Sequence, residues 1–261
     1  MQPDALKIGN FAVHWYGVLV ALGFIAGLWT AGRRAKLAGI APEKLHDIGP
    51  WLILGGVGGG RVLFVLTFWR DEFAGQAWWK VFAIWKGGLV FYGGLIGATI
   101  AGMLYVKLKK LPLWKMADIL APSIALGYAF GRIGCLMNGC CYGRSCDLPW
   151  AIHFPADHDT HGIGVHPTQI YDSLLSFCFY GFLAWRFRRR KFDGEVFAIY
   201  LIGYALIRSF VEYFRGDYRV HYLGGWATPA QVVSIVIIAS GLVLIFLLPR
   251  LQANKGSPGP G

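Results

Sequence analysis

Long apolar runs alternate with short clusters of charge along the whole chain. Each run is about 18–22 residues long, and a helix of about 20 residues crosses the roughly 30 Å of hydrocarbon in a bilayer. The pattern predicts an all-α integral membrane protein with a single membrane-embedded domain over residues 1–250. Its seven transmembrane helices are expected near residues 14–32, 48–68, 87–106, 116–137, 168–185, 195–214 and 229–248.

The segments between and beyond these runs are more polar. Residues 137–167 are expected to form an outer loop, and residues 251–261, rich in Gly and Pro, are expected to be a disordered tail. The first ten residues lack the basic flank, short apolar core and small-residue cleavage site of a removable signal peptide. We therefore expect the first helix to be retained.

Composition and charge agree with a membrane protein and predict its orientation. Hydrophobic residues make up 56% of the chain and charged residues only 15%, which suits a lipid solvent. Lys and Arg gather on one side of the predicted helices, and the other side carries fewer than half as many. The positive-inside rule then places the N-terminus outside and the C-terminus in the cytoplasm. The net charge of +11 is explained by this topology and by contact with anionic membrane lipids, without nucleic acid as a partner. The clusters lie at residues 33–44, 107–115, 186–191 and 250–255.

Three arginines lie inside apolar runs: Arg61, Arg132 and Arg208. A charge at bilayer depth costs at least ~2.5–3.5 kcal/mol, so each is a candidate functional residue. All three are about five to seven residues before the outer ends of their helices, or roughly 8–11 Å deep. A single arginine at this depth is also explained by a side chain that reaches the interface. Three at one depth favour a binding layer for an anionic lipid headgroup.

Other polar residues are predicted at the same outer level, in the first turns of the helices that run inward. They are His14, Trp15, Tyr16, Tyr92, His166, Gln169, Tyr171 and Asp172.

The sixth predicted helix has a polar stripe. Tyr204, Arg208, Glu212 and Arg215 are spaced so that they share one helical face, and Glu212 is expected to pair with Arg208. The alternative is an ion pair that only holds helices together. Arg132 has no acid at i±3 or i±4, so its counter-charge must come from another helix or from a ligand.

Glycines cluster in three of the runs. Gly94, Gly97 and Gly127 are expected to allow close helix packing. The glycines that flank and follow Arg132 suggest a helix end whose backbone N–H groups are open to an anion. These are Gly131, Gly134, Gly139 and Gly143.

An ordered set of motifs over residues 12–245 resembles the prolipoprotein diacylglyceryl transferase family. The most specific is Gly131-Arg132-Ile133-Gly134 followed by Asn138-Gly139 and Gly143. The others, in chain order, are His14-Trp15-Tyr16-Gly17, Gly59-Gly60-Arg61, Gly87-Gly88, Tyr92-Gly93-Gly94-Leu95-Ile96-Gly97, His166-Pro167-Thr168-Gln169-Ile170-Tyr171, Ile202-Gly203-Tyr204, Arg208, Glu212, Phe214 and Arg215.

The resemblance implies a multi-pass enzyme of the bacterial cytoplasmic (inner) membrane that needs no cofactor. Such an enzyme transfers the diacylglyceryl group of phosphatidylglycerol to the thiol of the lipobox cysteine in the signal peptide of a preprolipoprotein. A thioether forms and glycerol phosphate leaves. By this similarity Arg132 and Arg208 hold the lipid phosphate. The other residues implied or predicted to contact substrate or shape the pocket are Tyr16, Tyr204, Glu212, Asn138, Gly143, Arg61, His14 and His166.

Two departures from the family pattern concern the chemistry. Many members have histidine where this chain has Tyr92, and tyrosine, with a pKa near 10, is a poor general base. We expect Tyr92 to act by donating a hydrogen bond to the phosphate or ester. The base is then His14, His166 or no residue at all. The usual Asn and Glu of the signature are replaced by Cys135 and Cys140.

The cysteines of the outer loop support a rival interpretation as a membrane metalloprotein. Their C-x4-C-C-x4-C spacing matches no standard zinc or iron–sulfur pattern. In an oxidising compartment, a disulfide or free thiols rank before zinc, and zinc before a cluster. Nearby histidines are expected to be solvated. A lipid or anion transporter is the other alternative, although no internal repeat is visible. The residues are Cys135, Cys140, Cys141, Cys146, His153, His158 and His161.

Overall fold

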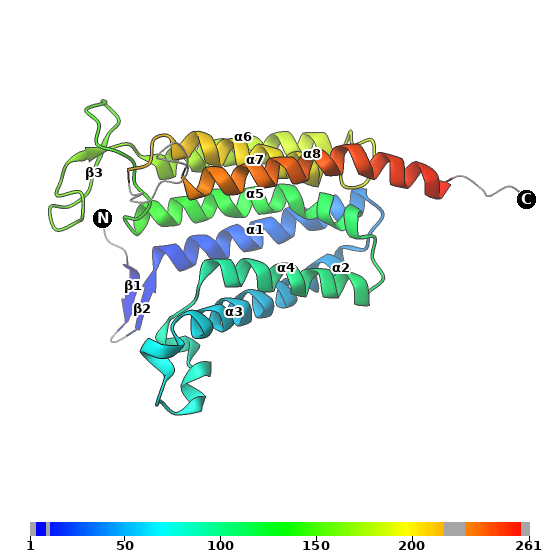
Figure 1. Cartoon of the computed structure of the whole chain (residues 1–261). Coiled ribbons are helices and arrows are strands. Elements are labelled where there is room, and N and C mark those ends of the chain that lie inside the picture. The colour runs from blue at the N-terminus through cyan, green and yellow to red at the C-terminus, as the bar shows by residue number, and fades with distance from the viewer. Residues whose placement is uncertain (1–3, 9–10, 217–227, 257–261) are drawn as a thin grey trace, which may run out of the picture. The chain divides into compact units, whose positions relative to one another are not determined.

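The structure is a computed structural model that describes residues 4–8, 11–216 and 228–256 (Figure 1). It is mostly helical, and each of the seven predicted ranges contains a helix. The chain divides into two compact units, residues 1–31 with 117–261 and residues 32–116. The long helices are α1 (Trp15–Leu37), α3 (Ile48–Thr67), α4 (Phe91–Leu108), α5 (Leu113–Met137), α6 (Thr168–Phe187), α7 (Glu195–Glu212) and α8 (Pro229–Gly256).

Five of the described helices are long and apolar enough to cross a membrane. They are α1, α4, α5, α8 and the single span Pro42–Thr67, which joins the short helix α2 (Pro42–His46) to α3. The other two long helices, α6 and α7, carry buried polar residues that include Asp172 and Glu212. These polar residues face protein, as expected of ionisable groups in a membrane domain.

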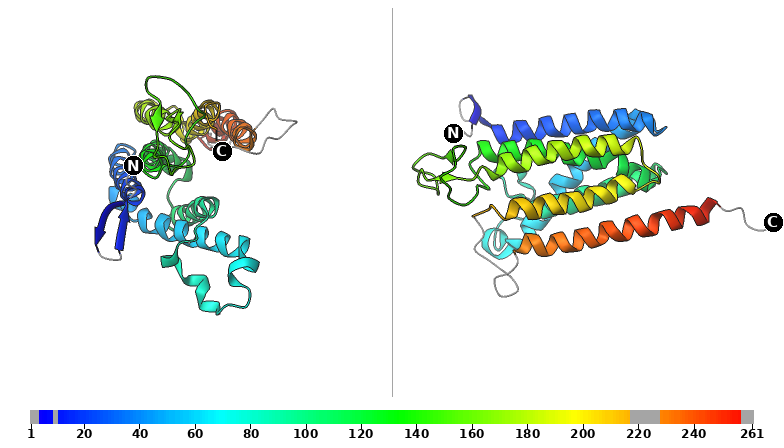
Figure 2. Two further views of the ribbon diagram at one scale, coloured as in Figure 1. Left: turned by 90° about the vertical axis from the view of Figure 1, so that its left-hand side faces the viewer. Right: turned by 90° about the horizontal axis from the view of Figure 1, so that it is seen from above.

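In the first unit, α5, α6, α7 and α8 run side by side (Figures 1 and 2). The chain reverses direction from each helix to the next, so the end of α5, the start of α6 and the end of α7 lie at one end of the bundle. The segment between α5 and α6 lies there as well. It contains the antiparallel strands β3 (Ile152–His153) and β4 (Gly164–Val165). A hairpin of β1 (Asp4–Ile8) and β2 (Phe11–His14) precedes α1.

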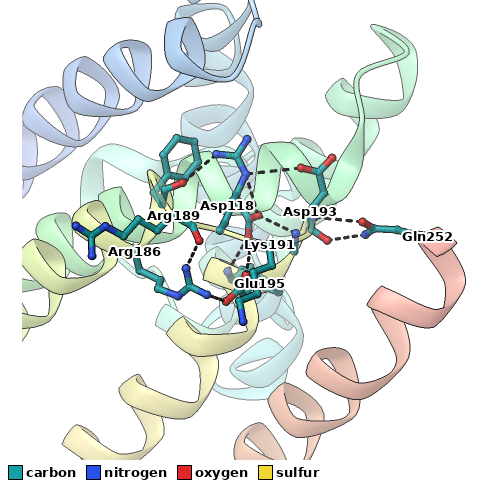
Figure 3. Close-up of polar contacts among 11 residues, drawn as sticks. Asp118, Arg186, Arg189, Lys191, Asp193, Glu195 and Gln252 are labelled. Atoms are coloured by element: carbon teal, nitrogen blue, oxygen red, sulfur yellow. Dashed lines mark hydrogen bonds and ion pairs between the residues drawn. The ribbon is translucent and has the colours of Figure 1, made fainter. Parts of the chain in front are cut away.

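At the opposite end of this bundle, Asp118 of α5 caps α7 (Figure 3). Its buried carboxylate accepts hydrogen bonds from the backbone N–H groups of Gly194 and Phe197, at 2.8 and 2.9 Å. These donors have no partner within their own helix, and a carboxylate there also matches the helix dipole. Glu195 forms an ion pair with Arg186 of α6. The connection between α6 and α7 is thus held by charge-assisted hydrogen bonds to a third helix.

Helix α8 extends into the segment that was predicted to be a disordered tail. Gln252 of α8 exchanges hydrogen bonds with the backbone of Asp193 (Figure 3), and α8 continues to Gly256. The prediction of disorder was therefore wrong for residues 251–256, because the apolar run of α8 carries the helix past the predicted end. Residues 257–261 lie outside the described part of the chain.

In the second unit, α3 and α4 pack backbone to backbone. A Cβ added at Gly59 would lie 2.3 Å from the Gly93 carbonyl oxygen, and one at Gly97 would lie 2.1 Å from the Gly55 oxygen. The predicted packing role of Gly97 is confirmed, since a side chain there would separate the helices. The unit also contains α2 (Pro42–His46) and the short turns Trp69–Phe73, Trp78–Phe82 and Ile84–Lys86.

Helix α4 begins at Phe91, later than the expected residue 87. Gly87 and Gly88 both have positive φ, +82° and +76°, a conformation that interrupts a right-handed helix and that glycine adopts readily. The glycine pair therefore ends the preceding turn and leaves α4 to begin after it.

Candidate active site

Arg132 forms an ion pair with Asp172, which lies one turn into α6. The distance from Arg132 Nε to Asp172 Oδ2 is 2.8 Å. Tyr128, four residues before Arg132 on α5, completes a triangle. Its hydroxyl accepts a hydrogen bond from Arg132 Nε at 2.9 Å and donates one to Asp172 Oδ2 at 2.8 Å. Of the two expected sources of counter-charge, another helix or a ligand, the structure shows another helix.

The Arg132–Asp172 ion pair is shielded from solvent, but some of its polar atoms have no hydrogen-bond partner among the described residues. The side chains of Arg132 and Asp172 are 13% and 2% exposed. Within the described part of the chain, Asp172 Oδ1 is buried without a hydrogen-bond partner. The contacts of Arg132 with Tyr128 use Nε and Nη2, and among the described residues its Nη1 makes no hydrogen bond. A buried guanidinium with unused donors is suited to bind an anion.

Arg208 and Glu212 form a second buried ion pair, on α7. Arg208 Nη1 lies 2.5 Å from Glu212 Oε2, and the side chains are 12% and 1% exposed. The prediction of this i,i+4 pair is confirmed. Tyr204, one turn before Arg208, packs edge-on against the Tyr128 ring with centroids 5.6 Å apart. The two tyrosines thus connect the Arg132 turn of α5 with the Arg208 turn of α7.

Tyr16 approaches the same region from α1. A Cβ added at Gly134 would lie 3.0 Å from Tyr16 Cδ2. The absence of a side chain at Gly134, two residues after Arg132, therefore makes room for the Tyr16 ring. Tyr16 also lies within electrostatic range of Arg132 and of three cysteines. His14, the last residue of β2, is exposed just before it.

The loop after α5 returns to the end of α7 through Gly143. The Gly143 N–H donates to the His166 carbonyl at 2.9 Å, and the Arg144 N–H donates to the Phe214 carbonyl at 2.8 Å. Gly143 also forms a β-bridge with Arg215. A Cβ at Gly143 would lie 2.5 Å from His166 Cβ and 2.7 Å from the Phe214 oxygen. Only glycine fits at position 143, where the loop packs against His166 and Phe214.

Cys135, Cys140 and Cys141 converge at the end of α5. Their three Sγ atoms lie within 4.8 Å of one another, and all are free thiols. Hydrogen bonds from the other two thiols lower the pKa of Cys141, and the guanidinium groups of Arg215 and Arg132 lower it further. Asn138 is exposed in the same turn.

His158 differs from its expected state. Its ring is stacked on Phe154 at a centroid distance of 4.5 Å, and Nε2 is 2.7 Å from the Gly139 carbonyl oxygen. The prediction that it is solvated was wrong, because strands β3 and β4 fold the outer segment into a small packed unit. His153 and His161 are exposed, as expected.

Two further predicted residues, Arg61 and Tyr92, belong to the second unit. Arg61 is buried, and its guanidinium donates to the backbone carbonyls of Val81, Gly87, Gly88 and Lys80 at 2.7–3.1 Å. Among the described residues these carbonyls are its hydrogen-bond acceptors, so Arg61 fastens the segment before α4 to α3. Tyr92, in the first turn of α4, is exposed.

Sequence reasoning placed Asp172 in the polar layer but missed its pairing with Arg132, and it missed Tyr128 altogether. The available signal was the i,i+4 spacing of Tyr128 and Arg132, which repeats that of Tyr204 and Arg208. Both pairs put a phenol one turn below a guanidinium.

Comparison with known proteins gives one consistent result. Residues 3–247 match the family model described as prolipoprotein diacylglyceryl transferase. The phosphatidylglycerol–prolipoprotein diacylglyceryl transferase of Gloeobacter violaceus is 35% identical, over 98% of this chain and 96% of the relative. The enzyme of the same name from Agrobacterium fabrum is 36% identical over 93% and 90%. That of Clostridium tetani is 32% identical over 97% and 99%.

Proposed function

The chain belongs to the prolipoprotein diacylglyceryl transferase family, and we propose that it transfers the diacylglyceryl group of phosphatidylglycerol to a prolipoprotein cysteine at the site around Arg132 and Arg208. The observation that carries the proposal is the pair of buried arginines, each paired with a carboxylate and each four residues after a tyrosine of the Tyr128–Tyr204 contact.

Arginine suits the leaving group of this reaction. The substrate thiolate attacks the glycerol carbon of the diacylglyceryl group, the C–O bond to phosphate breaks, and the phosphate monoester gains a negative charge. A guanidinium stays protonated and holds two phosphate oxygens at once. Because Nε of Arg132 is taken by Tyr128 and Asp172, its Nη1 is the donor that remains for phosphate.

Asp172 and Glu212 act as positioning residues. Each carboxylate fixes the rotamer of its arginine before substrate binds, which reduces the reorganisation needed as charge develops on the phosphate. The carboxylates also offset the cost of burying each guanidinium. They leave each pair neutral, so the anionic lipid head supplies the negative charge that the site then stabilises.

The membrane topology completes the proposal. All seven long helices span the bilayer, with the N-terminus outside, the C-terminus in the cytoplasm and the lipobox cysteine approaching from the outer side. The excess of Lys and Arg on the opposite loops supports this orientation. The cytoplasmic membrane of a bacterium is the matching location. The substrate-contact roles predicted for Tyr16, His14, Asn138, Gly143 and His166 are part of this proposal, and those of Arg61 and Tyr92 stay predictions from sequence.

The test is a transfer assay with purified protein in detergent, a synthetic lipobox peptide and phosphatidylglycerol, read by the mass gain of the peptide. We expect Arg132→Ala and Arg208→Ala to lower the rate by at least about 100-fold, since each removes charge stabilisation worth about 3 kcal/mol. Arg188→Ala, an exposed arginine at the opposite end of α6, is the matched control and should transfer normally.

No thioether product with any anionic phospholipid would refute the function. Equal losses in Arg132→Ala and Arg188→Ala would refute the site.

A further inference from the structure

Three thiols meet where α5 ends and the chain turns back. Cys135 lies in the last turns of α5, and Cys140 and Cys141 follow the helix. Gly139 and Cys141 both adopt positive φ, +73° and +65°. The Cys140 N–H donates to the Cys135 carbonyl at 3.1 Å. This turn places the three Sγ atoms within 4.8 Å of one another. A non-glycine residue with positive φ is uncommon and persists where surrounding contacts hold it.

Hydrogen bonds from α6 hold the backbone of this turn. Thr168 Oγ1 donates to the Cys141 carbonyl at 2.7 Å, and Gln169 Nε2 donates to the Cys140 carbonyl at 2.8 Å. Both side chains are almost fully buried. Such supporting contacts fix the direction of ligand side chains in metal sites. The cysteines are therefore positioned before any ligand arrives.

We propose that Cys135, Cys140 and Cys141 bind a zinc ion and leave its fourth coordination position open to the thiol of the substrate cysteine. Two sulfurs bound to one zinc ion at about 2.3 Å each can be no more than about 4.6 Å apart, so the observed spacing is close to that of a site. Thiolate ligands select zinc and other soft ions. Arg132 and Arg215 lie within electrostatic range of Cys141 and offset the negative charge of three thiolates.

This role rests on the proposed function and adds to it a means of activating the nucleophile. A thiol that coordinates zinc is deprotonated, so the substrate S–H proton passes to solvent on binding. The sulfur lone pair then forms the C–S bond, and the C–O electrons leave with glycerol phosphate. The neutral thioether is a weak ligand and dissociates.

The binding test uses the full-length protein in detergent and needs no enzymatic activity. Metal-free protein is titrated with Co²⁺, and the thiolate-to-cobalt charge-transfer band is recorded. Zinc-loaded protein is then analysed for metal content. We expect one equivalent of either ion. Cys135→Ser, Cys140→Ser and Cys141→Ser should each weaken binding by at least about 100-fold, because each removes one of three ligands.

Cys146→Ser is the matched control, since Cys146 lies in the same outer segment but outside the cluster. It should bind one equivalent. Thermal unfolding identifies any variant that fails to fold. The cobalt spectrum of the wild-type protein tests metal binding independently of the variants. Absence of the charge-transfer band in the wild type, or equal loss of binding in Cys146→Ser, would overturn the proposal.

The transfer assay separates this proposal from the function on which it rests. Wild-type protein that forms the thioether at the same rate with and without a chelator, and that binds no zinc, would overturn the zinc site and leave the transferase intact. Protein that binds one zinc through the three cysteines but forms no thioether would overturn the assigned substrate and leave a metal site of other use.

Discussion

Arg132 Nε lies 2.8 Å from Asp172 Oδ2, so a buried cation on α5 meets a buried carboxylate on α6. The hydroxyl of Tyr128 touches both groups. In a membrane domain this arrangement solves one physical problem, because neither charge could be buried alone at acceptable cost. It also fixes the guanidinium for the chemistry.

Asp172→Asn should lower transfer while leaving the protein folded. The amide keeps the size of the side chain but removes the charge that holds Arg132, so we expect a rate loss of roughly 10- to 100-fold. A positioning role predicts that kcat falls more than KM rises. Transfer kinetics over a range of lipid concentration measure both. Ser173→Ala is the control. It removes the hydroxyl of the residue that follows Asp172, which donates a hydrogen bond to the Ala129 carbonyl. An equal loss of transfer rate in Ser173→Ala would favour a general packing defect.

Arg61→Lys should loosen the segment before α4. Lysine carries its three N–H donors on one nitrogen and cannot replace the forked guanidinium with which Arg61 binds four part-buried backbone carbonyls. The loss of a hydrogen bond from a charged donor costs about 1.5–3 kcal/mol. Tryptic cleavage after Lys80 should become faster than in wild type and in the exposed control Arg70→Lys. Lost transfer with unchanged cleavage would instead indicate a direct contact between Arg61 and substrate.

Gly143→Ala and Gly131→Ala form a matched pair on either side of the helix end. Alanine at 143 would place Cβ 2.5 Å from His166 Cβ, whereas alanine at 131 meets nothing within 4 Å. We expect Gly143→Ala to destabilise the protein by about 1–3 kcal/mol, as overpacking does. Gly131→Ala should be neutral or stabilising by up to about 1 kcal/mol, since it lies within a helix. Thermal unfolding in detergent compares the stability of the two variants. Equal unfolding midpoints would contradict the close contact of Gly143 with His166 and Phe214.

Asp118→Ala should destabilise the first unit without touching the candidate active site. It removes the acceptor for two backbone N–H groups at the start of α7, and the loss of such a cap costs about 1–2 kcal/mol. The melting temperature should fall, and transfer at low temperature should persist. Asp157→Ala, at an exposed position of the outer segment, should change neither measurement.

The sequence by itself predicted the elements that depend on local pattern. Each of the seven predicted apolar ranges contains a helix, and five spans of the described chain are long and apolar enough to cross a membrane. The Arg208–Glu212 pair was predictable for the same kind of reason, since residues four apart share one face of a helix. The close packing at Gly97 was predicted from the spacing of small residues, although the helix it meets was not.

Tertiary structure decided what lies between elements. The partner of Arg132 is on another helix, and the four acceptors of Arg61 are backbone carbonyls that carry no sequence signature. The cysteine spacing matched no standard metal motif, yet a turn with two positive φ angles brings Cys135, Cys140 and Cys141 together. Periodicity records which face of a helix is apolar. Which polar group meets which across the bundle depends on how the helices pack, and that is a property of the folded chain.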